Sequence, residues 1–269
     1  MATTSRRKIS RLINQSVMKQ PLNKAFLTDV MSAIETRDQK YRRKPSQWYK
    51  PSSFVCLRQM YFMRTGEVPD VTRTEYNAVG MADTGTRRHV AIQEVLQEME
   101  SLGYDWKYLD VSEYLNRKWS EGKCLDIEIV GKVGAETKLF HKTLSISFMC
   151  DGILERLSTG CCYLFEFKNQ VSFKFNGKEK VDAEHIDQVS TYCMALDLDE
   201  CFVLYENRDT CNLECPELLQ ITPEMKQRQV DKILECESYV ERMVPPPVYE
   251  TTKPCRWCQY QTACKKAGK

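Results

Sequence analysis

The sequence lacks the features of secreted, membrane-spanning and ATP-driven proteins. No apolar run approaches transmembrane length, and the opening stretch MATTSRRKISRLINQ is charged and polar, unlike a signal peptide. The Walker phosphate loop, G-x₄-G-K followed by Ser or Thr, is absent, which argues against a motor. Net charge is only +2, so any basic surface must be local. These absences favour a cytoplasmic globular protein.

Histidine is scarce and cysteine is abundant, with 3 and 13 residues in a chain of 269. In a reducing compartment, clustered cysteines indicate metal binding or catalysis before disulfides. The stretch KPCRWCQYQTACKK holds Cys255, Cys258 and Cys264, spaced C-x₂-C-x₅-C. A closed thiolate site needs four ligands, so the spacing predicts a metal site with one further cysteine elsewhere.

Apolar periodicity predicts helices and strands in one mixed α/β domain. Helical spacing covers residues 1–43, 56–66, 84–103, 181–199 and 221–243. Alternation typical of strands covers residues 126–133, 142–155, 161–169 and 201–209. Ser52 or Ser53 is a candidate N-cap for the second helix, and Pro223 suits the first turn of the last one.

An aspartate, a glutamate and a lysine gather in the strand region. Asp151 ends one predicted strand, and Glu166 and Lys168 share one face of the next. A buried acid and amine are costly unless they are paired or bound to metal. The two carboxylates can hold a hard divalent cation, and Lys168 can orient the nucleophile or offset phosphate charge. The alternative is a surface ion pair on an edge strand.

Further polar residues lie on the predicted helices. Gln188 and Tyr192 stand at i and i+4 and share one face of a predicted helix. This pair could steady Lys168 or touch substrate. The alternative is an exposed polar stripe. His89 lies on an apolar helix stripe and should point inward, as a core residue or as a ligand. An imidazole beside two carboxylates would favour tolerance of manganese over strict use of magnesium.

Taken in order, these motifs resemble the PD-(D/E)XK nucleases of the RecB type. The Gln-x₃-Tyr element distinguishes the RecB branch, and the likeness covers residues 50–266. It implies a restriction-endonuclease-like core, with a central mixed sheet flanked by helices. The chain departs from the family in lacking the proline of the PD name and the glycine that usually precedes the aspartate.

The resemblance also implies roles for individual residues. The metal ligands, for Mg²⁺ or Mn²⁺, would be His89, Asp151, Glu166 and the backbone carbonyl of Phe167. The catalytic set would be Asp151, Glu166, Lys168, Gln188 and Tyr192, the last two positioning Lys168 or the DNA. The implied activity is hydrolysis of DNA phosphodiester bonds, as an exonuclease on single strands or ends.

A subset of these nucleases brackets its core with four cysteines. The CRISPR-associated exonucleases with an iron–sulfur cluster and the AddB-type helicase–nucleases carry one cysteine before the core and C-x₂-C-x₅-C after it. The early one here would be Cys56, in PSSFVCLRQMYFMRTG. The likeness implies a structural 4Fe–4S cluster at Cys56, Cys255, Cys258 and Cys264, joining residues 46–66 to 250–266. Zinc is the alternative, although no second C-x₂-C pair exists.

The predicted organisation is a helical extension, residues 1–45, before a nuclease domain, residues 46–269. The expected partner is DNA, with a separate helicase, recombinase or integrase-type protein and no membrane, in a bacterial, archaeal or phage-encoded system. Candidate phosphate contacts are the turn 174–180, Arg58, Arg87, Arg88, Lys253, Arg256, Lys265, Lys266 and Lys269. Candidate stacking residues are Phe173, Phe175 and Tyr260. No base-reading motif is present, so sequence specificity is not expected.

Two hypotheses from other classes stay open at this point. One is a non-catalytic DNA-binding or adaptor subunit that keeps the nuclease fold, against which the presence of both carboxylates and Lys168 argues. The other is a zinc-stabilised interaction protein whose Glu-Phe-Lys strand is coincidental. A colourless protein with stoichiometric zinc would favour the latter.

Overall fold

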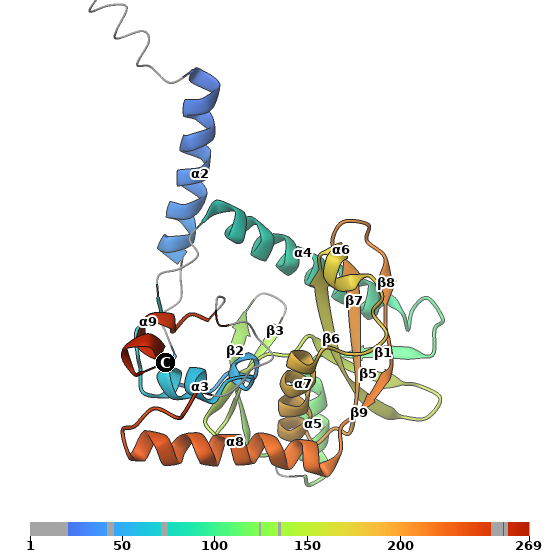
Figure 1. Ribbon diagram of the computed structural model, residues 1–269. Coiled ribbons are helices and arrows are strands. Elements are labelled where there is room, and N and C mark those ends of the chain that lie inside the picture. Colours follow the sequence, from blue (N-terminus) through green and yellow to red (C-terminus); the bar gives the residue numbers. More distant parts are fainter. Residues whose placement is uncertain are drawn as a thin grey trace, which may run out of the picture. The chain divides into compact units, whose positions relative to one another are not determined.

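The computed structural model describes residues 21–41, 46–70, 75–123, 125–133, 136–248, 255 and 258–268 (Figure 1). The helices are α2 (Leu22–Tyr41), the 3₁₀ turn η1 (Pro51–Ser53), α3 (Leu57–Arg64), α4 (Tyr76–Glu98), α5 (Val111–Ser120), α6 (Ser172–Phe175), α7 (Ala183–Leu196), α8 (Pro223–Glu241) and α9 (Gln261–Lys266). The strands are β1 (Trp106–Leu109), β2 (Ile127–Val133), β3 (Glu136–His141), β4 (Ile146–Phe148), β5 (Gly152–Arg156), β6 (Cys161–Gln170), β7 (Glu200–Asn207), β8 (Leu213–Glu214) and β9 (Leu218–Gln220).

The chain divides into two compact units, residues 1–43 with 71–83 and residues 44–70 with 84–269. In the smaller unit, α2 accounts for part of the predicted N-terminal helix, and the backbone N–H of Tyr76 donates to Glu35 at 3.2 Å. Residues 1–20 and 42–43 of that prediction lie outside the described residues.

The larger unit is built on a six-stranded mixed sheet in the order β1-β5-β6-β7-β8, with β9 also paired to β7. Strands β6 and β7 are parallel, and α7 provides the crossover that parallel neighbours require. Phe165 and Phe167 of β6 pack with Ile92 of α4 on one face. Leu164 packs into the main core with Val189 of α7 on the other. The predicted mixed α/β class, with helices flanking a central mixed sheet, is confirmed.

A second, separate sheet has three strands in the order β2-β3-β4. The strand pattern over residues 142–155, with the predicted strand end at Asp151, corresponds to two strands, because β4 ends in the small sheet at Phe148 and β5 begins in the large one at Gly152. The residues between them include Asp151, which is followed by Gly152 at φ +153°. That backbone angle strongly favours glycine, and it lets the chain leave one sheet and enter the other.

Several helix ends differ from the predictions. Neither Ser52 nor Ser53 caps α3, since both lie in η1 and Cys56 occupies the N-cap position with extended backbone. Helix α4 begins at Tyr76, ahead of the predicted start at residue 84. For α8 the prediction is confirmed, because Thr222 accepts a hydrogen bond from the N–H of Met225 and a proline follows it.

Two buried charged residues tie helices together in the larger unit. Asp187 of α7 accepts hydrogen bonds from Arg228 at 3.0 Å and Gln229 at 3.2 Å, both on α8. Arg58 of α3, which is 5% exposed, donates to the carbonyls of Cys264 at 3.1 Å and Ala267 at 3.4 Å. Charged groups at such depth are tolerated because they are paired or hydrogen-bonded. Among the described helices, none has the length and apolarity to cross a bilayer.

Candidate functional site

Asp151 occupies the point where the chain passes from the small sheet to the large one, and its backbone is held firmly there. The carbonyl oxygen of Asp151 accepts from the Gln93 side-chain amide at 2.7 Å and from the Tyr108 hydroxyl at 2.8 Å. One carboxylate oxygen accepts from the N–H of Phe167 at 2.7 Å. The other lies 3.0 Å from Nδ1 of His89. Two contacts to the backbone carbonyl and two to the carboxylate therefore fix the position of Asp151.

Two of these contacts were not predicted from the sequence. Gln93 is 3% exposed and lies four residues after His89, so both project from the same face of α4. Tyr108 belongs to β1, a strand that the periodicity did not reveal. The i, i+4 spacing of His89 and Gln93 was the available signal for the first, and nothing local indicated the second.

Glu166 is buried on a central strand next to Asp151. Gly152 pairs with Phe165 in the β5–β6 ladder, so continuing this antiparallel register places Asp151 opposite Glu166. Glu166 is 3% exposed, and its Oε2 has no hydrogen-bond partner. Burial raises the pKa of Glu166 to about 7, with the charge of Asp151 adding to the effect and Lys168 opposing it. A buried carboxylate oxygen without a donor is the kind of group a cation would satisfy.

Lys168 contacts both Glu166 and the helix on that face of the sheet. Its Nζ lies 2.6 Å from Oε1 of Glu166 and 3.0 Å from Oε1 of Gln188. The Gln188 amide nitrogen in turn donates to Glu166 at 3.0 Å and to the Tyr192 hydroxyl at 2.8 Å. Burial lowers the pKa of Lys168, but the carboxylate of Glu166 outweighs burial, and the pKa is raised overall. Lys168 is therefore held as a cation in a fixed direction.

These positions settle two of the alternatives left open by the sequence. The pair of Glu166 and Lys168 is not a surface ion pair on an edge strand, because β6 lies between β5 and β7 and the two side chains are 4% and 18% exposed. Gln188 and Tyr192 are not an exposed stripe, since both face the pair and Tyr192 is 5% exposed.

His89 points inward, as predicted, toward Asp151. Its ring packs edge-on against Phe167 with centroids 5.0 Å apart. Burial lowers the pKa of His89, but the hydrogen bond and charge of Asp151 outweigh it and leave the pKa raised.

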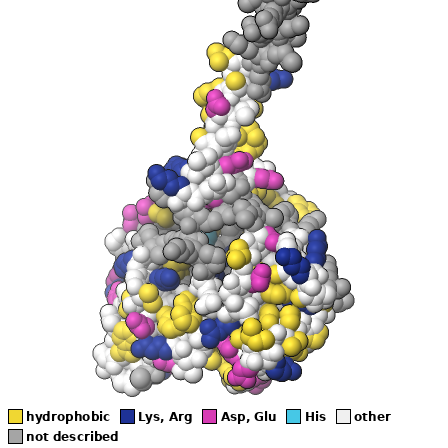
Figure 2. Space-filling model, turned by 90° about the vertical axis from the view of Figure 1, so that its left-hand side faces the viewer, with side chains coloured by type: hydrophobic (Ala, Val, Ile, Leu, Met, Phe, Trp, Pro, Cys, Tyr) yellow, Lys and Arg dark blue, Asp and Glu magenta, His cyan; other side chains and the backbone are white. Residues whose placement is uncertain are grey.

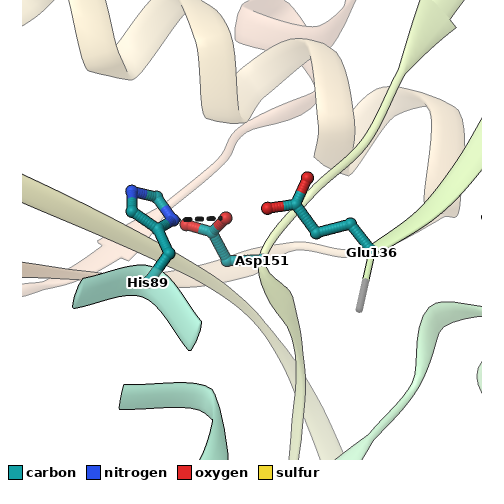
Figure 3. A group of neighbouring side chains, drawn as sticks. All are labelled: His89, Glu136 and Asp151. Carbon is teal, nitrogen blue, oxygen red and sulfur yellow. Dashed lines mark hydrogen bonds and ion pairs between the residues drawn. The ribbon is translucent and has the colours of Figure 1, made fainter. Parts of the chain in front are cut away.

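A third carboxylate at the site was missed. Ligand atoms of His89, Asp151 and Glu136 lie within 4.8 Å of one another, and Figure 3 shows the Glu136 carboxylate directed toward Asp151. Glu136 begins β3, which the sequence analysis did not predict as a strand. An imidazole with carboxylate oxygens is a donor set that suits divalent Mg²⁺, Mn²⁺ or Zn²⁺, so the residues present fit a cation.

The predicted cysteine ligands belong to two segments, with Cys56 at the start of α3 and Cys255, Cys258 and Cys264 before and within α9. Burial raises the pKa of Cys56, and the thiols of Cys255 and Cys264 add to that effect. Burial also raises the pKa of Cys258, with Cys56, Cys264 and Cys255 adding. Cys56 is the N-cap residue of α3, and Cys264 lies in α9, to which Arg58 of α3 donates a hydrogen bond. Within the described chain, no three of these cysteine sulfur atoms lie within 4.8 Å of one another, and the cluster stays a prediction.

Several residues predicted to contact DNA are bonded to other groups of the protein instead. Arg58 binds carbonyls of α9, and Arg88 forms a charge pair with the buried Glu206 at 2.9 Å. Lys178 is 7% exposed and lies 2.7 Å from Asp182. Tyr260 is 2% exposed, so it is not available for stacking on bases. Lys253, Arg256 and Lys269 lie outside the described residues.

Phe173 is the predicted stacking residue that remains accessible. It is 88% exposed on α6, directly after the strand that carries Glu166 and Lys168. On the face of the molecule shown in Figure 2, the coloured basic side chains are interspersed with acidic ones and form no single basic patch. Any contact of this face with a polyanion would therefore depend on individual basic side chains and not on a continuous basic patch.

Comparisons with known proteins add little to this geometry. No protein-family model matches the chain, and no curated protein matches it. A solved structure described as the crystal structure of SSO0001 is 13% identical, covers 91% of this chain and 98% of its own, and superposes with a TM-score of 0.39. At this identity and TM-score, the likeness carries no argument, and the function has to be argued from the site itself.

Proposed function

We propose that the chain is a metal-dependent DNA nuclease that hydrolyses phosphodiester bonds, as an exonuclease on single strands or ends. The observation that carries the proposal is the buried Glu166, which has one oxygen without a partner and the other bound to Lys168. Asp151 lies opposite it, held by four contacts. Burying two carboxylates and a lysine costs desolvation free energy, and such perturbed groups cluster at functional sites.

Each residue has a distinct part in the proposed reaction. When bound, a divalent cation supplies Lewis-acid charge that stabilises the phosphorane and acidifies water. Asp151 and Glu166 would hold it, helped by His89 and by the Phe167 backbone carbonyl that the family resemblance implies. Lys168 places its ammonium beside the same carboxylate, where it can orient water or offset charge on the phosphate.

Gln188 and Tyr192 are positioning residues in this scheme. Gln188 bridges Lys168 and Glu166, and the Tyr192 hydroxyl accepts from the same amide. A side-chain amide cannot rotate freely once both of its ends are bonded, so Gln188 keeps the ammonium from swinging away. Phe173 would offer an exposed aromatic face to an unpaired base, which supports single-stranded DNA as substrate.

Replacing Glu166 with glutamine tests the proposal directly. The change keeps the shape of the side chain but removes its charge, and we expect cleavage to fall by about 10³-fold. The measurement is release of label from end-labelled single-stranded DNA with Mn²⁺ or Mg²⁺. Glu113→Gln, at a half-exposed site on α5, is the control and should cleave as wild type does. Inertness of the wild type toward DNA with either metal would refute the proposal.

We further infer that Cys56, Cys255, Cys258 and Cys264 bind a structural 4Fe–4S cluster. The mutual influence of their thiols supports this, and so does Arg58, which ties α3 to α9 beside them. A shared metal centre would join segments about two hundred positions apart in sequence, and closing so long a loop favours the folded state.

Removing one thiol should abolish that cluster. Anaerobically purified wild type is expected to be brown, and Cys258→Ala colourless and less stable to urea. Cys211→Ala, an exposed cysteine outside this group, is the matched control and should keep the colour. Iron and zinc analysis of both proteins decides the metal, because a colourless wild type with one equivalent of zinc would contradict the iron–sulfur assignment.

A further inference from the structure

The C-terminal ends of β6 and β7 carry polar side chains beyond the apolar packing of the large sheet. The two strands are parallel neighbours, so these ends meet at one edge of the sheet. Asn169 pairs there with Glu206, and Asn169 shares a face with Phe167, which packs with Ile92 of α4. After this pair the chain turns away on both strands, into α6 and into the β7–β8 hairpin (Figure 1).

Two arginines are bonded to this pair. Glu206 is fully buried and accepts from Nε of Arg88 at 3.0 Å, with Nη2 of the same arginine at 2.9 Å. The Asn169 amide nitrogen donates to the same carboxylate at 3.4 Å, and its oxygen accepts from Nε of Arg208 at 2.8 Å. The four side chains form one hydrogen-bonded chain. A buried carboxylate requires such pairing, so Arg88 serves the fold, and it holds the amide oxygen of Asn169 toward Arg208.

Arg208 is held by neutral groups and has no carboxylate to balance. Nε binds the Asn169 side chain, and Nη2 donates to the Asn169 carbonyl at 3.4 Å. Among the residues that the structure describes, Arg208 forms no ion pair, and the carboxylate of the neighbouring Asp209 accepts from the N–H of Ser172 at 3.0 Å. The side chain of Arg208 is half-buried. An oriented guanidinium with further N–H groups to donate is suited to a phosphate oxygen.

An exposed aromatic ring is tied to the same turn. Oγ of Ser172 lies 2.5 Å from Asp209 and 3.0 Å from Asn207, which bonds the start of α6 to the turn after β7. Phe173 and Arg208 are the sequence neighbours of this bonded pair, and Phe173 is 88% exposed. The fold therefore brings a guanidinium and an aromatic ring to one edge of the sheet. These are the groups that bind the phosphate and the base of an unpaired strand.

We propose that Arg208 and Phe173 form a nucleotide-binding subsite for single-stranded DNA. Arg208 binds a backbone phosphate, and Phe173 stacks on a base. The subsite rests on the proposed function and deepens it, because Asn169, which orients Arg208, directly follows Lys168 along β6. In a duplex both faces of each base are covered by stacked neighbours, so the ring contact favours unpaired strands.

Binding of DNA without metal tests the subsite apart from any cleavage. The probe is a fluorescent oligothymidylate with hydroxyl ends, which carries backbone phosphates alone, and its anisotropy is measured in EDTA over a range of salt. Arg208→Gln is expected to weaken binding by about 10-fold and to reduce the salt slope by about 0.7, the value for one phosphate contact on a single strand. Phe173→Ala should weaken binding by about 10-fold with the slope unchanged.

Arg242→Gln is the matched control, since Arg242 at the end of α8 is likewise held by a carbonyl, that of Ser238 at 2.8 Å. It should bind as wild type does. Arg208→Lys keeps the charge without the planar fork, so it should restore the salt slope but not the full affinity. Circular dichroism checks that each variant is folded.

Unchanged affinity and salt slope in Arg208→Gln, an equal loss in Arg242→Gln, or no binding of the probe by wild type would overturn the inference. The proposed function fails separately. Metal-free binding that weakens in Arg208→Gln, together with a wild type that cleaves no DNA, would keep the subsite and remove the nuclease. Cleavage by wild type with unchanged binding in Arg208→Gln would do the reverse.

Discussion

Replacing Lys168 with methionine is expected to reduce DNA cleavage by about 10³-fold while the protein stays folded. Methionine keeps an unbranched apolar stem in the buried channel but has no ammonium to place beside Glu166. Loss of Lys168 also removes the group that lowers the pKa of Glu166, so that carboxyl would take up a proton and avoid standing as an unpaired buried charge. This variant therefore separates the effect of Lys168 on DNA cleavage from its effect on folding.

The measurement is the initial rate of label release from single-stranded DNA at saturating Mn²⁺, alongside urea unfolding. Lys123→Met is the control, because Lys123 pairs with Asp197 at the surface and both side chains are 51% exposed. It should cleave at the wild-type rate. Cleavage by Lys168→Met within a few fold of wild type would mean that this lysine only balances the buried carboxylate.

Replacing Gly152 with alanine is expected to lower the free energy of unfolding by about 4 kcal/mol. A Cβ at this position would lie 2.3 Å from the ring of Tyr108, and φ +153° is strained for any residue with a side chain. Tyr108 would have to move and would lose its hydrogen bond to the carbonyl of Asp151. Since that bond fixes Asp151, the proposed DNA cleavage should fall together with stability.

Two variants divide this effect into its causes, measured by urea unfolding. Gly160→Ala tests strain alone, because Gly160 has φ +70° with open space around it, and should cost about 1 kcal/mol. Tyr108→Phe tests the hydrogen bond alone and should cost about 1 kcal/mol, with cleavage reduced. If Gly152→Ala is no worse than Gly160→Ala, close packing against Tyr108 is not what requires glycine here.

Much of the larger unit could be predicted because its elements have strong local patterns. The alternation in CCYLFEFKN marks β6, and the helical spacing after Pro223 marks α8. The strand predicted over residues 142–155 failed because hydrophobic alternation continues through Met149 and Cys150, although the backbone changes sheets there. Alternation reports burial on one side of a strand and does not report which sheet the strand joins.

The same limit explains which site residues could be found. Glu166 and Lys168 are two positions apart on one strand, so their proximity follows from local geometry. Glu136 comes next to Asp151 only through the register of a hairpin, and Tyr108 only through packing of β1 against β5. Such neighbours are set by tertiary structure. Counting outward from the turn between β3 and β4 would have found Glu136 if the hairpin had been recognised.

The hydrogen bonds from Arg58 to α9 have a consequence for how the protein is made. Arg58 and Cys264 are 206 positions apart, so on a ribosome adding about 5 to 20 residues per second the α3 segment waits roughly 10 to 40 s for its partner. During that interval Cys56 lacks the thiol of Cys264 as a possible co-ligand. A metal centre that uses Cys56 and Cys264 together can therefore be completed only once α9 has emerged from the ribosome.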